Sequence, residues 1–62
     1  MARTIEDIEQ DIDDARQDVE NTRSFLTKYP GYREQETLAT LQQRITKLQK
    51  LESELAAAKR RS

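Results

Sequence analysis

The tetrapeptide Tyr29-Pro30-Gly31-Tyr32 contains the only proline and the only glycine of this 62-residue chain. A proline disfavours helical angles at the residue before it, and a glycine readily adopts the left-handed angles that a tight reversal needs. We therefore expect a turn over about residues 29–32. One helix of about residues 4–28 precedes it, and a second helix of about residues 33–60 follows it.

Apolar residues recur every three or four positions on both sides of this turn, which is the spacing of one face of an α-helix. The row before the turn is Ile5, Ile8, Ile12, Ala15, Val19, Thr22 and Leu26. The row after the turn is Leu38, Leu41, Ile45, Leu48, Glu52 and Leu55. Reversal at Pro30 pairs Val19 with Leu41, Ala15 with Ile45, Ile12 with Leu48 and Ile5 with Leu55. The predicted fold class is all-α, an antiparallel two-helix hairpin of coiled-coil type.

The start of the first helix has a local signal. Thr4 precedes Asp7 by three residues, so its hydroxyl is placed to accept a hydrogen bond from the amide of Asp7. The early acids Glu6 and Asp7 and the late base Lys28 all complement the helix dipole. These features predict a capped first helix.

The second row contains one polar interruption. Position 52, where the heptad predicts an apolar residue, is Glu52, and Leu51 lies one step round the helix. In one interpretation Leu51 covers Ile8 inside a distorted seam. In the other, a flank of Phe25, Leu51 and Ala58 meets a second hairpin. The sequence leaves both open.

A hairpin of this length has one seam and no third wall to cover its apolar rows. The chain has no cysteine and no histidine, so neither a disulfide nor a common zinc site supplies the missing stability. We therefore expect a homodimer or higher homo-oligomer, most simply a four-helix bundle. The candidate self-association residues are Ile5, Ile8, Ile12, Val19, Phe25, Leu41, Ile45, Leu48, Leu51 and Leu55.

Charge is distributed unevenly along the chain. Residues 1–22 carry a net charge of −6 and residues 23–62 a net charge of +5. The two parts therefore attract each other, either within a hairpin or across a dimer. The bases Arg44 and Lys47 fall opposite Asp18 and Asp14 in the predicted register.

Four aspartates, Asp7, Asp11, Asp14 and Asp18, follow one edge of the first helix. This edge is either solvated or paired within the hairpin, or it is a surface that binds a partner protein, for example by imitating DNA phosphates. A straight helix does not wrap the six or more oxygens of a calcium site, so we expect no metal here.

All aromatic residues gather at the turn, where Tyr29 and Tyr32 flank the Pro-Gly pair and Phe25 lies one helical turn earlier. They either pack over the end of the helix pair or form a recognition surface with nearby Arg33. The candidate partner-binding residues are Asp7, Asp11, Asp14, Asp18, Tyr29, Tyr32 and Arg33.

Catalysis finds no support in this sequence, because it has no histidine or cysteine and no glycine-rich phosphate loop. We expect no cofactor. No aromatic residue is interleaved with the basic residues of the second helix, so nucleic-acid binding is not expected. The charged N-terminal stretch and the lack of roughly 20 consecutive apolar residues predict a cytoplasmic protein without membrane association.

The function predicted from the sequence is a non-enzymatic protein–protein interaction or self-assembly module. The alternative is a small phage- or plasmid-type inhibitor or regulator. Such a protein would bind a nucleic-acid-handling protein through the acidic edge or the aromatic turn.

Overall fold

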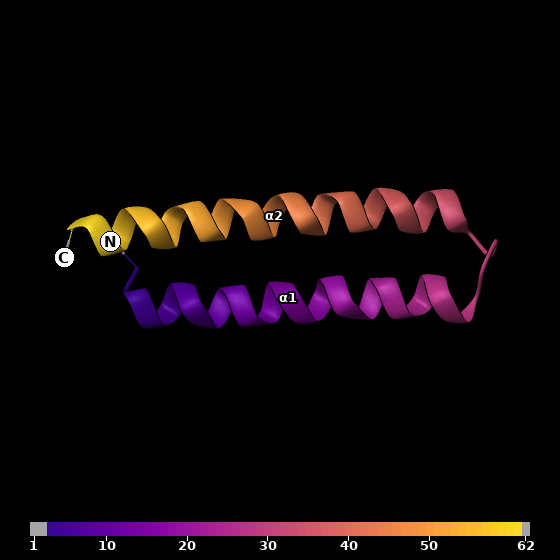
Figure 1. The fold of residues 1–62 in the computed structure, drawn as a ribbon, viewed down its shortest axis with the longest axis horizontal. Coiled ribbons are helices and arrows are strands. Elements are labelled where there is room, and N and C mark those ends of the chain that lie inside the picture. The colour runs from indigo at the N-terminus through magenta and orange to yellow at the C-terminus, as the bar shows by residue number, and fades with distance from the viewer. Residues whose placement is uncertain (1–2, 62) are drawn as a thin grey trace.

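The computed structural model describes residues 3–61. It contains two helices, α1 (Ile5–Lys28) and α2 (Glu34–Arg61), which run antiparallel side by side as an elongated rod of 46 × 17 × 15 Å (Figure 1). No strand occurs within the described range, so the predicted all-α hairpin is confirmed. The predicted helices covered about residues 4–28 and 33–60.

Both ends of α1 are capped by local hydrogen bonds. Thr4 has an extended backbone, and its hydroxyl oxygen accepts a hydrogen bond of 3.1 Å from the backbone N–H of Asp7. At the other end, the N–H of Tyr29 donates to the carbonyl of Phe25 at 2.9 Å. The cap at Thr4 is the one that the sequence predicts.

The connection between the helices uses two residues with left-handed backbone angles. Gly31 has a φ of 84°, and Arg33, the residue before α2, has a φ of 49°. A side chain disfavours this region, so Gly31 is suited to it and Arg33 is strained. The reversal is therefore centred near Gly31 and ends only at Glu34.

The interior of the hairpin comes mainly from α1. Its buried residues are Ile8, Ile12, Ala15, Val19 and Thr22, all members of the predicted row. From α2, only Leu51 is buried, with 8% of its surface exposed. Leu48, Leu55 and Ala58 pack against this core while remaining partly exposed. The two helices thus contribute unequally to the seam.

The predicted register of α2 is wrong. Val19, expected beside Leu41, lines a groove with Ile45 and Leu48, and Leu38, expected in the seam, is 47% exposed. Leu51 replaces Glu52 in the interior, because the seam of α2 drifts round the helix. The position of Leu51 against Ile8, Ile12 and Ala15 matches the distorted-seam interpretation.

The apolar row predicted for α2 is therefore only partly covered by α1, with Leu48 and Leu55 packed against the core and Leu38 exposed. Leu38 and Ile45 are seven residues apart and so share a face, which is displaced from the face that carries Leu51.

Neither helix within the described part of the chain is long and apolar enough to cross a membrane.

Candidate self-association surface

One side of the seam is hollowed by two shallow grooves, and we call it the open side. The first groove is lined by Glu9, Ile12, Asp13, Arg16, Glu52, Leu55, Ala56 and Lys59. The second is lined by Arg16, Val19, Glu20, Arg23, Ile45, Leu48, Gln49 and Glu52. Their floors are aliphatic, and their rims carry charges of both signs. The open side therefore combines an apolar surface with a surrounding rim of acidic and basic side chains.

An ion pair lies between these grooves. The Nη2 atom of Arg16 on α1 is 3.8 Å from Oε2 of Glu52 on α2, and both residues line both grooves. The side chains are 62% and 50% exposed, so this pair adds little to the stability of a single hairpin. It divides the open side into two apolar halves.

Most aliphatic side chains of α2 are only half covered by α1. Leu41, Ile45, Leu48 and Leu55 are all half-buried, and Leu38 is exposed on the face that carries Ile45. These positions are the apolar row that the sequence predicts for α2. In a single hairpin the row meets water along much of its length.

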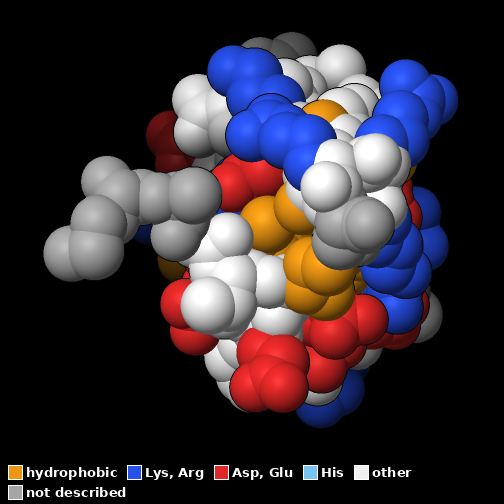
Figure 2. All heavy atoms as spheres, turned by 90° about the vertical axis from the view of Figure 1, so that its left-hand side faces the viewer, with side chains coloured by type: hydrophobic (Ala, Val, Ile, Leu, Met, Phe, Trp, Pro, Cys, Tyr) orange, Lys and Arg blue, Asp and Glu red, His pale blue; other side chains and the backbone are white. Residues whose placement is uncertain are grey.

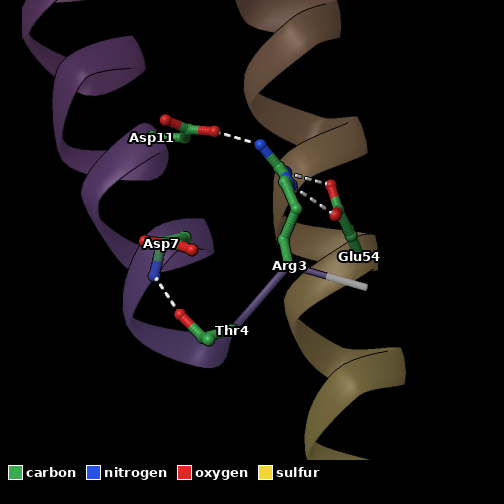
Figure 3. Close-up of polar contacts among 5 residues, drawn as sticks. All are labelled: Arg3, Thr4, Asp7, Asp11 and Glu54. Atoms are coloured by element: carbon green, nitrogen blue, oxygen red, sulfur yellow. Dashed lines mark hydrogen bonds and ion pairs between the residues drawn. The ribbon is translucent and has the colours of Figure 1, made fainter. Parts of the chain in front are cut away.

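The opposite side of the seam, which we call the closed side, is bridged near the chain ends by Arg3. Its guanidinium binds Asp11 of α1 and Glu54 of α2 together, and its Nε lies 2.9 Å from Oε2 of Glu54 (Figure 3). The hydrogen bond to Glu54 raises the pKa of Arg3 above its ordinary value. Sequence reasoning missed this bridge, because Arg3 precedes the helix and reaches both partners only in the folded hairpin.

Nearer the turn, Arg44 of α2 reaches α1 on the same side, where it lines a third groove together with Thr22 and Phe25. Its Nη1 donates to the hydroxyl of Thr22 and, at 3.3 Å, to the carbonyl oxygen of Asp18. The hydroxyl of Thr22 in turn donates to the Asp18 carbonyl at 2.8 Å. The predicted ion pair between Arg44 and the Asp18 carboxylate is therefore replaced by hydrogen bonds to uncharged oxygens. Thr22, 4% exposed, keeps a polar group satisfied inside the seam.

The three aromatic rings form a cluster at the turn. The ring centroid of Phe25 lies 5.1 Å from that of Tyr29 and 6.3 Å from that of Tyr32. Both tyrosines are more than half exposed, whereas Phe25 is half-buried. The cluster covers the end of the hairpin and also presents aromatic surface to solvent. Arg33 beside it pairs with Glu36 at 3.5 Å.

The row of four aspartates is not uniform in the structure. Asp11 is half-buried and paired with Arg3, while Asp7, Asp14 and Asp18 are exposed. Asp14 accepts a hydrogen bond of 3.4 Å from Gln10. Among the described residues, the expected ion pair of Lys47 with Asp14 is not formed. This edge therefore presents three exposed carboxylates.

The ten candidate self-association residues lie in different parts of the hairpin. Ile8, Ile12, Val19 and Leu51 are buried inside the hairpin, and Phe25 belongs to the aromatic cluster. Ile5 is half-buried at the start of α1. Leu41, Ile45, Leu48 and Leu55 are the candidates that leave substantial aliphatic surface uncovered.

The end of the rod near the chain termini shows the charge pattern directly. Acidic side chains gather over α1, basic side chains gather over α2, and hydrophobic atoms are visible between them (Figure 2). Helix α1 contains eight acidic and three basic residues, and α2 contains four acidic and six basic residues. The net charges of −5 and +2 make the helices electrostatic complements.

Within residues 3–61, no group of three or more acidic side chains is arranged to hold a metal ion. Comparison of the chain with protein-family models, curated proteins and solved structures gave no match.

Proposed function

We propose that this hairpin is a non-enzymatic self-association module in which a second copy covers the open side and completes a four-helix bundle. The observation that carries the proposal is the half-covered aliphatic row Leu41, Ile45, Leu48 and Leu55 beside the two grooves. Burial of apolar surface contributes about 25 cal/mol per Å², so a partner that covers this row stabilises the fold substantially.

The small interior supports the need for such a partner. Five hydrophobic residues are buried in the described hairpin, and one of them is Ala15. Chains below about 70–80 residues rarely gain enough stability from one core unless a disulfide, a metal or an oligomer supplements it. This chain has no cysteine, so the first of these routes is closed.

A second copy is the occupant that the charges favour. The strongly acidic α1 and the basic α2 are complementary, so α1 of one hairpin attracts α2 of another. The grooves have an aliphatic floor and a charged rim, the arrangement found where amphipathic helices pack into bundles.

Sedimentation equilibrium of the native chain tests the proposal. We expect a mass of about twice the 7.3 kDa of one chain, and a melting midpoint that rises with protein concentration, since association stabilises the folded state by mass action. A folded species of 7.3 kDa whose midpoint does not change with dilution would contradict the proposal.

A matched pair of variants distinguishes loss of association caused by a charge in the groove from loss caused by an added charge elsewhere on α2. Ile45→Glu places a carboxylate in the groove and should weaken association, whereas Gln43→Glu adds the same charge at an exposed position of α2 outside the grooves. Equal loss of the dimer in both variants would argue against the open side as the interface.

A specific observation also favours the inhibitor-type alternative. Tyr29 and Tyr32 are 54% and 60% exposed, and Asp7, Asp14 and Asp18 present carboxylates to solvent. In this second proposal the chain binds a DNA-handling protein through these groups. Capture from a bacterial lysate by the native chain is compared with capture by a chain in which the exposed Asp7, Asp14 and Asp18 are changed to Asn. A retained DNA-binding protein that added duplex DNA displaces, and that the variant loses, supports it. Equal capture by both chains contradicts it.

A further inference from the structure

We propose that the Arg16–Glu52 pair fixes how two copies pack, with both aromatic turns at the same end of the bundle. This inference rests on the proposed self-association through the open side. It adds the orientation of the two hairpins, which the apolar rows alone do not determine. The pair is the polar interruption between two aliphatic grooves, and the argument starts from that position.

A hairpin laid on the open side encloses this pair. Arg16 and Glu52 are at least half exposed in the single hairpin, so water satisfies their remaining hydrogen-bonding capacity. The guanidinium has five N–H donors and the carboxylate has two acceptor oxygens, and one contact of 3.8 Å uses little of either. Charges that lose water without gaining partners are strongly destabilising. The second copy must therefore supply polar partners at this level of the rod.

Two arrangements with two-fold symmetry place one open side on another. When the symmetry axis is parallel to the helices, α1 of each copy lies over α2 of the other, and the two turns lie together. When the axis crosses the helices at right angles, α1 lies over α1 and α2 over α2, and the turns lie at opposite ends. Every other feature of the apolar grooves is compatible with both.

The ion pair distinguishes these arrangements. With the turns together, Arg16 of each copy lies opposite Glu52 of the other copy at the same level. The four side chains then form a ring of alternating charge, in which each guanidinium lies between two carboxylates.

With the turns apart, the same side chains oppose their own kind. Arg16 lies at the middle of α1 (Ile5–Lys28), so complete overlap of two antiparallel α1 helices brings the two Arg16 residues together. Sliding the copies apart instead places the charges against an aliphatic groove. The turns-apart dimer also stacks two α1 helices that each carry a net charge of −5. Both effects favour the turns-together dimer, much as one polar layer selects orientation in coiled coils.

Distance measurement between spin labels tests the orientation. The native chain has no cysteine, so Tyr32→Cys or Lys28→Cys gives a single label near the turn. We expect label separations below about 30 Å, since packed helix axes lie about 10 Å apart and the label linkers add to this. A separation near the 46 Å length of the rod, in a species with the mass of a dimer, overturns the proposed orientation while self-association stands. A monomer mass overturns both proposals.

Two further variants test the role of the pair itself. In the label background, Arg16→Leu with Glu52→Leu removes the polar layer, and we expect the dimer to persist while a second population with long separations appears. The exchange Arg16→Glu with Glu52→Arg keeps the alternation of charge, and should retain the single short separation. If the doubly apolar variant still gives only the short separation, the pair does not determine the orientation.

Discussion

The two sides of the seam differ in how polar side chains connect the two helices. On the closed side, Arg3 and Arg44 reach across from one helix to the other and bind oxygens there. On the open side, a single exposed pair, Arg16 with Glu52, crosses between grooves with aliphatic floors. The closed side is bridged at these two points and keeps a groove near the turn, lined by Thr22, Phe25 and Arg44, whereas the open side has grooves with aliphatic floors along the seam. This difference is the basis of the proposed self-association, in which the closed side meets solvent and the open side meets a second copy.

The largest expected effect comes from the interior that both sides share. Ile12 is 4% exposed and contacts the core of Ile8, Ala15 and Leu51. Ile12→Asp buries a carboxylate in that core, and we expect a loss of at least about 4 kcal/mol, enough to abolish the fold. Far-ultraviolet circular dichroism should show loss of helix together with loss of the dimer. Asp14→Asn, at an exposed position outside both open-side grooves, is the control, and retained helix in Ile12→Asp would show that the seam is not the source of stability.

The next effect addresses the open side alone. Ile45→Glu should raise the dissociation constant of the dimer by about 100-fold, corresponding to the roughly 2–3 kcal/mol expected for burial of an isoleucine side chain. Sedimentation at several concentrations measures the change. Arg44, the neighbouring residue on the closed side, gives the comparison, since Arg44→Met should leave the dissociation constant within a few-fold of the native value. If the two variants weaken association equally, the distinction between the sides is lost.

A smaller effect is expected on the closed side near the turn. Thr22→Val keeps the volume of this buried residue but removes the hydroxyl that Arg44 and the Asp18 carbonyl share. We expect a loss of about 1 kcal/mol in the free energy of unfolding, because one net hydrogen bond disappears and Arg44 must turn to solvent. Chemical denaturation at fixed protein concentration measures it. Thr27→Val, whose hydroxyl bonds only within its own exposed turn, should change the midpoint less.

The smallest effect belongs to the bridge at the chain ends. Arg3→Ala removes the contacts with Asp11 and Glu54, whose side chains are both 43% exposed, so the loss in the free energy of unfolding should be smaller than that of Thr22→Val. The native chain should lose the same increment in high salt, which screens exposed charges. Arg60→Ala is the control near the end of α2. A loss of helix in Arg3→Ala as complete as that expected for Ile12→Asp would mean that the closed side stabilises the fold as much as the core does.

Local signals in the sequence were sufficient for the elements of this fold. The Thr4 cap, the Pro-Gly turn and the row from Ile8 to Thr22 each depend on residues close in sequence, and all appear in the structure. Periodicity located the row on α1 correctly, because that whole row faces α2.

The relation between the helices was harder to predict. Whether Leu51 or Glu52 faces inward depends on the rotation of α2 about its axis, and one residue changes that rotation by about 100°. The length of the turn sets this rotation of α2. Arg33 extends the turn with left-handed backbone angles, which are not expected for an arginine. Contacts of long side chains, such as Arg3 with Glu54 across 51 residues, depend on this rotation too. The residues of the open side therefore could not be predicted from the sequence and were identified only from the structure.

The connection of residues 29–33 is exposed at every position and carries the left-handed angles of Gly31 and Arg33. A backbone that stands clear of the core in this way is open to limited proteolysis, and a cut after Tyr32 or Arg33 would divide the molecule into two peptides of similar size. Two such fragments, mixed after separation, would associate only through the non-covalent contacts of the seam. The turn thus offers a natural place to split the protein into complementing halves and to measure how tightly α1 and α2 hold each other without a covalent link.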